Sequence, residues 1–284
     1  MKNKLKASMR IFLFTLFALI FLISQPVYSS EIEFIKQVEE RGYLRVGIPP
    51  YNTPPFYYLD EQNKLQGYDV DIARKFAEEL NVKIIFDRSS NSFNDLVKRA
   101  GANEIDMAIG KLGTTYKRMK DAHPHEYMNF RHGLLTNRKM ISSLQGNIPD
   151  DKFAKILLNS KIKIGFIDNS AYDTYATILF PNAIKKGYAS WDGAKEALLE
   201  DDIDAIYRDA TEIKKIVYQT PSLSLEYVPV LIDDLIDQKS IYVSTNINSE
   251  MGSVLDYYLS KEIKVKTDTE IMDDYQSYYQ PIKK

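Results

Sequence analysis

Short apolar runs alternate along the chain with segments of helical period, and this alternation restricts the possible folds more than any other feature. Buried strands are predicted at three such runs: residues 43–48, 82–86 and 105–109. Residues 70–80 carry apolar side chains at offsets of three and four, which marks one face of a helix. Residues 93–100 form a second helical segment, which Asn91 or Ser92 would cap. Because strands and helices alternate, we expect an α/β unit with a mainly parallel sheet.

The second half of the chain repeats this order of elements. Residues 161–167 and 203–207 are predicted strands. Helices are predicted after Ser170, at residues 191–200 and from Ala210 onward. The repetition predicts two similar lobes, each with a mainly parallel sheet flanked by helices, and ligands of such sheets bind at the carboxyl ends of the strands.

Four segments are predicted from this organisation: an export signal at 1–29, the first part of lobe 1 at 30–133, lobe 2 at 134–229, and a return to lobe 1 with C-terminal helices at 230–284. We expect the chain to cross between the lobes near residues 130–136 and 228–231. A cleft between two lobes would then be the natural place for a ligand.

The first 29 residues have the pattern of a cleaved signal peptide. A basic start is followed by an apolar run at residues 11–23, and small residues precede the expected cut after Ser29. An uncleaved N-terminal anchor is the alternative. The chain has no cysteine, so it offers no site for a lipid anchor and no thiol chemistry. We therefore expect an exported, unlipidated protein in the periplasm, a monomer by default.

Charge excludes some classes of partner. The signal segment holds four of the 37 Lys and Arg residues, which leaves 33 against all 39 Asp and Glu residues and a net charge of −6. A negative mature chain argues against nucleic acid or anionic lipid as the partner. About 255 remaining residues are enough for two lobes with buried cores.

The stretch from Gly110 to Arg118 carries the clearest chemical signal. It is rich in Gly and Thr and ends in an arginine, whose planar fork suits a carboxylate. About ninety residues later, Asp209 follows a short apolar strand, and a lone aspartate suits an ammonium group. On opposite walls of a cleft, these two side chains would hold the two charges of a free α-amino acid.

Four segments resemble the family 3 extracellular solute-binding proteins, the periplasmic receptors for polar amino acids of ABC importers. They are Gly42–Gly47 with Pro55-Phe56, Gly67–Ala73, Ile105–Arg118 and Ile203–Asp209, and the similarity runs from about Arg41 to Val217. The resemblance implies the type II periplasmic binding protein fold, with the ligand cleft between the lobes. It also implies that a small solute is captured by hinge closure and delivered to a membrane permease.

The same resemblance implies roles for particular residues. Arg118 matches the arginine that binds the ligand carboxylate, and Gly113 and Thr115 match donors to the same group. Asp209 matches the carboxylate that accepts from the ligand ammonium. Ser170 lies where the family places a helix N-terminus against an anion. Capping of the following helices is the simpler explanation for both Ser170 and Asp209.

Three further residues are candidate ligand contacts. Tyr51 and Phe93 lie near the positions of the aromatic side chains that enclose the ligand, although both could be ordinary core residues. Arg208 would suit an acidic or amide ligand side chain if the strand end directs it into the cleft. Alternatively, it is solvated or pairs with Asp202 or Glu212.

The sequence departs from the family at three places. Lys111 replaces a glycine whose carbonyl often faces the ligand ammonium, residues 124–128 differ from the usual segment after the arginine, and the family's C-terminal Asp-Gly turn is absent. These departures keep two other functions open. One is a periplasmic accessory or sensory protein that uses the fold without an importer. The other is a dehydratase-like enzyme, with Glu126 or a histidine as general acid.

Three histidines fall within ten residues, at His123, His125 and His132. A His-x-His pair on a strand can bind zinc, but the sequence offers no clear further ligand. We expect no metal and no cofactor. The tyrosine-rich segment from Asp274 to Gln280 is predicted to be a core edge rather than a partner surface.

Overall fold

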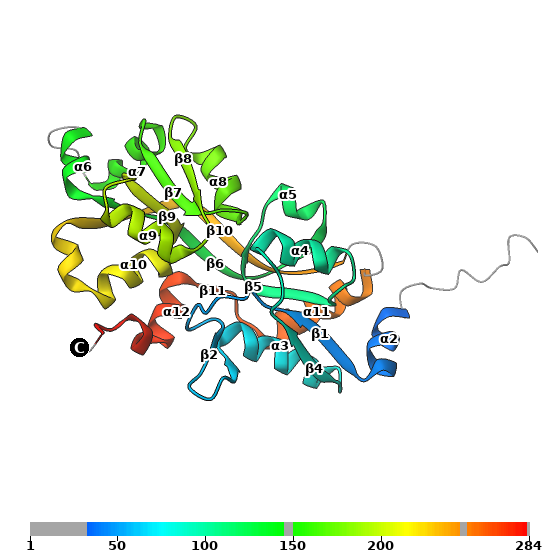
Figure 1. Cartoon of the computed structure of the whole chain (residues 1–284). Helices are drawn as coiled ribbons and strands as arrows, with labels where there is room; N and C mark the ends of the chain where they lie inside the picture. The colour runs from blue at the N-terminus through cyan, green and yellow to red at the C-terminus, as the bar shows by residue number, and fades with distance from the viewer. Residues whose placement is uncertain (1–32, 145–149, 245–248, 283–284) are drawn as a thin grey trace, which may run out of the picture.

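The computed structural model describes residues 33–144, 150–244 and 249–282. Two long strands, β6 (Ala122–Asn137) and β10 (Tyr227–Ser244), pair antiparallel through the middle of the molecule. They join two groups of strands into one mixed sheet with the order β4-β1-β5-β10-β6-β9-β7-β8. Figure 1 shows β6 and β10 running from one group of elements to the other.

The first lobe contains the strands on the β10 side of this pair. They are β1 (Tyr43–Gly47), β4 (Lys83–Asp87) and β5 (Met107–Gly113), all parallel. The helices of this lobe are α2 (Glu33–Arg41), α3 (Tyr68–Glu79), α4 (Phe93–Gly101), the short α5 (Tyr116–Met119) and α11 (Ser249–Glu262). A small hairpin of β2 (Tyr58–Leu59) and β3 (Leu65–Gln66) precedes α3. The predicted apolar face of α3 is buried, and Ser92 caps α4 by accepting from the Asp95 amide.

The second lobe contains the strands on the β6 side. They are β7 (Lys163–Ile167), β8 (Ile184–Tyr188) and β9 (Ala205–Asp209), and β7 runs parallel to both others. Its helices are α6 (Arg138–Leu144), α7 (Asp150–Asn159), α8 (Ala171–Leu179), α9 (Trp191–Leu199) and α10 (Ala210–Gln219). Ser170 caps α8 and Asp209 caps α10, as their positions before predicted helices suggested.

The C-terminal segment packs against both lobes. After α11 comes β11 (Lys266–Thr267), which pairs with β6. It is followed by α12 (Asp268–Asp274) and a 3-10 turn at Gln276–Tyr279. Another 3-10 turn, at Pro221–Leu225, precedes β10. Gln219 of α10 donates to the Tyr278 carbonyl, and the Tyr278 and Tyr58 hydroxyls lie 2.6 Å apart. Tyr279 is buried, so the tyrosine-rich segment lies against the body of the protein, as expected.

Two features of this arrangement differ from the sequence-based expectation. β5 continues to Gly113, beyond the strand predicted at residues 105–109, because β10 pairs with it as far as Lys239. The expected lobe boundaries at 133/134 and 229/230 fall inside the continuous strands β6 and β10. The pairing of these strands shifts between Ile232 and Ile236, opposite Arg131 and His132. The division into segments therefore stays a proposal.

The predicted signal peptide at residues 1–29 lies outside the described residues. Within the described ranges, no helix is both long and apolar enough to cross a membrane.

Candidate functional site

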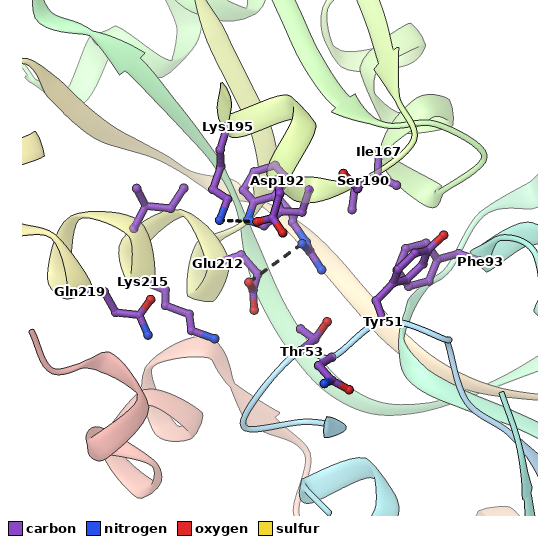
Figure 2. A pocket seen from close by; sticks show the side chains of 14 residues that line it. Tyr51, Thr53, Phe93, Ile167, Ser190, Asp192, Lys195, Glu212, Lys215 and Gln219 are labelled. Atoms are coloured by element: carbon purple, nitrogen blue, oxygen red, sulfur yellow. Dashed lines mark ion pairs between the residues drawn. The ribbon is translucent and has the colours of Figure 1, made fainter. Parts of the chain in front are cut away.

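Two adjoining cavities lie between the lobes. The outer one has a volume of about 430 Å³ and is shown in Figure 2. Residues of the first lobe that line it are Tyr51, Asn52, Thr53 and Phe93; those of the second include Ile167, Ser190, Trp191, Asp192, Lys195, Arg208, Glu212 and Lys215. The inner one has a volume of about 20 Å³ and shares Phe93, Ile167 and Arg208 with it. A ligand-sized cavity therefore adjoins a small polar one.

Arg118 lines the inner pocket and is 2% exposed. It follows β5 on the short helix α5, which Thr115 caps by accepting from the Arg118 amide. Its Nε donates to Asn94 Oδ1 at 2.9 Å, and its Nη1 donates to the Gly113 carbonyl at 2.8 Å. Neutral acceptors thus orient the guanidinium, and no carboxylate of the described residues forms an ion pair with it. Burial consequently lowers the pKa of Arg118.

The N-terminus of α8 reaches the same pocket. Ser170 accepts from the Tyr172 amide at 3.2 Å and donates to the Ile167 carbonyl at 2.5 Å. Gly113 lies opposite, where a Cβ atom would meet Ala171 Cβ at 2.8 Å and the Tyr175 hydroxyl at 2.9 Å. Glycine therefore lets β5 approach α8 closely. A positive helix end and a buried guanidinium face one small space, which suits an anion.

Asp209 is fully buried at the end of β9, and its hydrogen-bonding capacity is used within the protein. Lys111 reaches across from β5 in the first lobe, with its Nζ 3.1 Å from Asp209 Oδ1. The same Nζ lies 3.1 Å from Glu212 Oε1 and 3.1 Å from Thr211 Oγ1. Tyr172 donates to Asp209 Oδ2 at 3.1 Å. The carboxylate expected to hold a ligand ammonium thus holds a lysine ammonium of the chain itself.

Both acidic groups bound by Lys111 stay ionised. Burial acts to raise the pKa of Asp209, but the charges of Lys111 and Lys239 together hold it well below its usual range. Burial likewise opposes ionisation of Glu212, and Lys111 and neighbouring cations nevertheless lower its pKa to about 2. At neutral pH, Lys111 therefore lies between two negative charges.

Arg208 lines both cavities and Asp209 lines the inner one, because the strand ends at this point and both side chains turn inward. It is 5% exposed, so it is not a solvated surface residue. Its Nη1 lies 4.0 Å from Glu212 and its Nε 3.9 Å from Asp209, both longer than the Lys111 contacts. The guanidinium also stacks 5.0 Å from the centre of the Trp191 ring.

The aromatic candidates lie together on one wall of the outer cavity. The rings of Tyr51 and Phe93 are 5.7 Å apart and tilted by 39°, and Figure 2 shows them beside each other. Trp191, on the second lobe, was not a candidate from sequence. Its place at the start of a predicted helix following Ser190 was the only available signal. Aromatic surface thus borders the outer cavity on both lobes.

Several other residues lie away from the two cavities. Thr115 caps α5 and is not part of either lining. Glu126 accepts from Asn129 and Gln238 and lies outside both linings. His125 pairs with Asp256 at 2.6 Å, and His132 bonds the Tyr207 hydroxyl at 2.6 Å. The described residues contain no group of three or more His, Asp or Glu side chains suited to a metal ion.

Sequence comparison relates the chain to known proteins. Residues 44–160 match the model of the bacterial extracellular solute-binding proteins, family 3. The arginine-binding periplasmic protein of Mannheimia haemolytica is 27% identical over 157 residues, which are 55% of this chain and 59% of that protein. A membrane-bound lytic murein transglycosylase F of Vibrio vulnificus is 31% identical over 119 residues, 41% of this chain and 21% of that protein. The chain thus spans less than two thirds of these curated relatives.

Comparison with solved structures establishes the fold. The amino acid ABC transporter substrate-binding protein AbpA of Streptococcus pneumoniae, solved with bound L-arginine, superposes with a TM-score of 0.67. The match covers 86% of this chain and 99% of that one, at 19% sequence identity. The α/β architecture and mixed sheet are those of the type II periplasmic amino-acid-binding proteins, as the resemblance implied.

Proposed function

Because the chain belongs to family 3 of the bacterial extracellular solute-binding proteins, we propose that it is a binding protein for a small solute that carries a carboxylate. In this proposal the solute is enclosed between the lobes. Its carboxylate lies in the inner pocket and the rest of the molecule lies in the outer cavity. Amino acids are the solutes named for the relatives, and carboxylates of the same size form the wider class.

The observation that carries this proposal is that Arg118 forms no ion pair with a carboxylate of the described residues. The side chain is buried between the lobes, and its hydrogen bonds go to an amide oxygen and a backbone carbonyl. Burying an unpaired cation costs free energy, and a bound carboxylate would recover it. The N-terminus of α8 adds a second favourable electrostatic contribution in the same pocket.

Direct contacts between the lobes support capture by closure. Tyr175 of α8 donates to the Thr114 carbonyl at 2.7 Å, and Lys215 of α10 donates to the Pro54 carbonyl at 2.6 Å. The strands β6 and β10 are the natural hinge, since they connect the lobes and their pairing shifts there. A ligand that binds both walls would shift an open–closed equilibrium toward the closed form.

The proposed cellular role follows from the relatives and from the N-terminal segment. An exported binding protein in the periplasm would deliver its solute to the permease of an ABC importer. A catalytic role has less support, since Glu126 and the histidines lie outside the linings of both cavities. An accessory or sensory protein without an importer would use the same carboxylate site.

Thermal unfolding of the chain from residue 30 onward, with and without candidate solutes, tests the proposal. A carboxylate that binds only the folded state raises the melting temperature by mass action. We expect at least one of a panel of amino acids and organic acids to do so. Arg118→Ala should abolish the shift and Arg118→Lys should reduce it, since lysine lacks the planar fork.

Arg138→Ala is the matched control, because Arg138 is on α6 and lines neither cavity. It should bind as the wild type does. The proposal fails if no carboxylate stabilises the wild-type protein, or if Arg118→Ala binds the same solute with unchanged affinity.

A further inference from the structure

The position of Lys111 narrows the class of solute. We infer that the preferred ligand is a carboxylate without an amino group, such as a 2-oxo or 2-hydroxy acid, rather than an α-amino acid. This inference rests on the proposed carboxylate site at Arg118. It concerns the second half of the pocket, where an amino acid would need acceptors for its ammonium.

Lys111 already uses those acceptors. Its Nζ lies 3.1 Å from one oxygen atom each of Asp209, Thr211 and Glu212. An ammonium group has three N–H donors, so these three acceptors use all of them. The side chain is buried and crosses from the first lobe to the second. Lys111 and Asp209 both line the inner pocket, so a ligand ammonium placed there would meet acceptors that the lysine already uses. A second ammonium would have to displace the first.

The charges around the pocket agree with the geometry. Three carboxylates, those of Asp209, Glu212 and Asp237, face three cations, those of Lys111, Arg208 and Lys239. Arg118 adds a fourth cation and forms an ion pair with no carboxylate of the described residues. A simple carboxylate would balance the site, whereas a zwitterionic amino acid would bring a further cation among charges that are already balanced.

The backbone makes the role of Lys111 testable. Its φ of +55° lies in the left-handed region, which glycine adopts without strain. Lys111→Gly therefore suits the backbone while it frees Asp209 and Glu212. In this variant, Asp209 and Glu212 should be free to accept hydrogen bonds from the ammonium of a ligand. The site would also carry one positive charge fewer.

The outer cavity is suited to the remainder of such an acid. Tyr51, Phe93 and Trp191 provide apolar surface for a carbon skeleton. Arg208 and Lys215 add cationic groups that would donate hydrogen bonds to a second carboxylate or to a hydroxyl oxygen. Hydroxy acids, oxo acids and dicarboxylates share the property that matters here, which is a carboxylate without an ammonium.

Isothermal calorimetry with matched ligands tests the inference. Each set contains an α-amino acid, its 2-hydroxy acid and its 2-oxo acid with the same carbon skeleton: for example alanine, lactate and pyruvate, or glutamate, 2-hydroxyglutarate and 2-oxoglutarate. Aromatic and branched-chain sets complete the panel. For the set that binds, we expect the wild-type protein to bind an acid without the amino group at least tenfold more tightly than the amino acid.

Lys111→Gly should reverse or remove that preference, with a change of at least tenfold in the ratio of dissociation constants. Lys111→Gln is a second variant that keeps a side chain at this position and should shift the ratio in the same direction. Lys64→Gly is the control for loss of charge, since Lys64 lies in an exposed turn. It should keep the wild-type preference.

The outcomes separate the inference from the proposed function. If the wild-type protein binds the amino acid as tightly as its analogues, and Arg118→Ala abolishes that binding, the inference is overturned while the carboxylate site stands. If both Lys111 variants keep the wild-type ratio, the inference is also overturned. If no member of any set binds, the proposed function and the inference fail together.

Discussion

Lys111 and Asp209 belong to different lobes, and their 3.1 Å ion pair joins β5 to the end of β9 at the base of the cleft. The pair lies 98 residues apart in sequence and is almost completely buried. Lys111 also bonds Glu212, so one lysine holds two carboxylates of the second lobe. We therefore expect the contact to affect two properties at once, namely ligand selectivity and the stability of the closed form.

Lys111→Met should favour separation of the lobes. The substitution leaves Asp209 and Glu212 without their shared cation, and an open cleft lets water solvate them. We expect a loss of about 1–3 kcal/mol in the free energy of unfolding and a larger radius of gyration in small-angle X-ray scattering. Lys64→Met, in an exposed turn, should change neither quantity; an unchanged radius in Lys111→Met would contradict the interlobe role.

Gly113→Ala should obstruct closure. An added methyl group would lie 2.8 Å from Ala171 Cβ and 2.9 Å from the Tyr175 hydroxyl, so β5 and α8 would have to separate. We expect ligand affinity to fall by about 1–3 kcal/mol, with a smaller effect on the unfolding of the open form. Gly193→Ala on α9 is the control, since its nearest contact would be an ordinary 3.4 Å. Equal affinity in the two variants would count against close approach at Gly113.

Asp69 should make stability decrease as pH rises. The side chain is fully buried on α3 and accepts a hydrogen bond from Tyr127; burial raises its pKa from the usual 3.8 to about 7. The folded state binds the proton of Asp69 more tightly than the unfolded chain does, so protonation of Asp69 stabilises the fold. This stabilisation is complete below pH 3.8 and is lost as the pH rises through 7.

Asp69→Asn keeps an oxygen acceptor for Tyr127 and removes the ionisation. We expect the variant to be more stable than the wild type at pH 8 by an amount on the order of 1–4 kcal/mol, with a flatter profile between pH 4 and 7. Urea unfolding at several pH values measures this. The exposed Asp71→Asn on the same helix should show the wild-type slope.

Glu212 should make the stability of the fold decrease as the pH falls into the acid range, which is the opposite of the effect of Asp69. Lys111 and neighbouring cations overcome the effect of burial and lower its pKa from 4.5 to about 2. The unfolded chain therefore binds more protons in this interval, so the contribution is complete above pH 4.5 and is lost as the pH falls through 2. Glu212→Gln should lose about 1–3 kcal/mol at pH 7 and unfold with a weaker acid dependence. The exposed Glu226→Gln is the control, and identical acid profiles of wild type and Glu212→Gln would contradict the pairing with Lys111.

Much of the fold followed from local patterns. The buried face of α3 and the caps at Ser92 and Ser170 depend on residues within a few positions of each other, so sequence spacing was enough to predict them. The lengths of β6 and β10 were not predicted. Their pairing with each other, and with strands of both lobes, decides where they end, and no local pattern records a partner that is a hundred residues away.

The candidate site likewise combines residues that local sequence predicted with one that it did not. Arg118, Asp209, Ser170 and Phe93 could be named from motifs, and the structure brings them to one pocket. Trp191 was missed because a tryptophan at a helix start has no distinctive spacing.

By itself, the sequence determined the alternation of elements and the caps, and it marked the segment that ends in Arg118 as a candidate carboxylate site, since these features depend on neighbouring residues. Only the tertiary structure decided that Lys111 bonds Asp209 and Glu212 and that Arg118 pairs with no carboxylate among the residues described. The physical reason is that charge compensation in a buried site depends on distance in space, which the packing of two lobes sets and sequence separation does not.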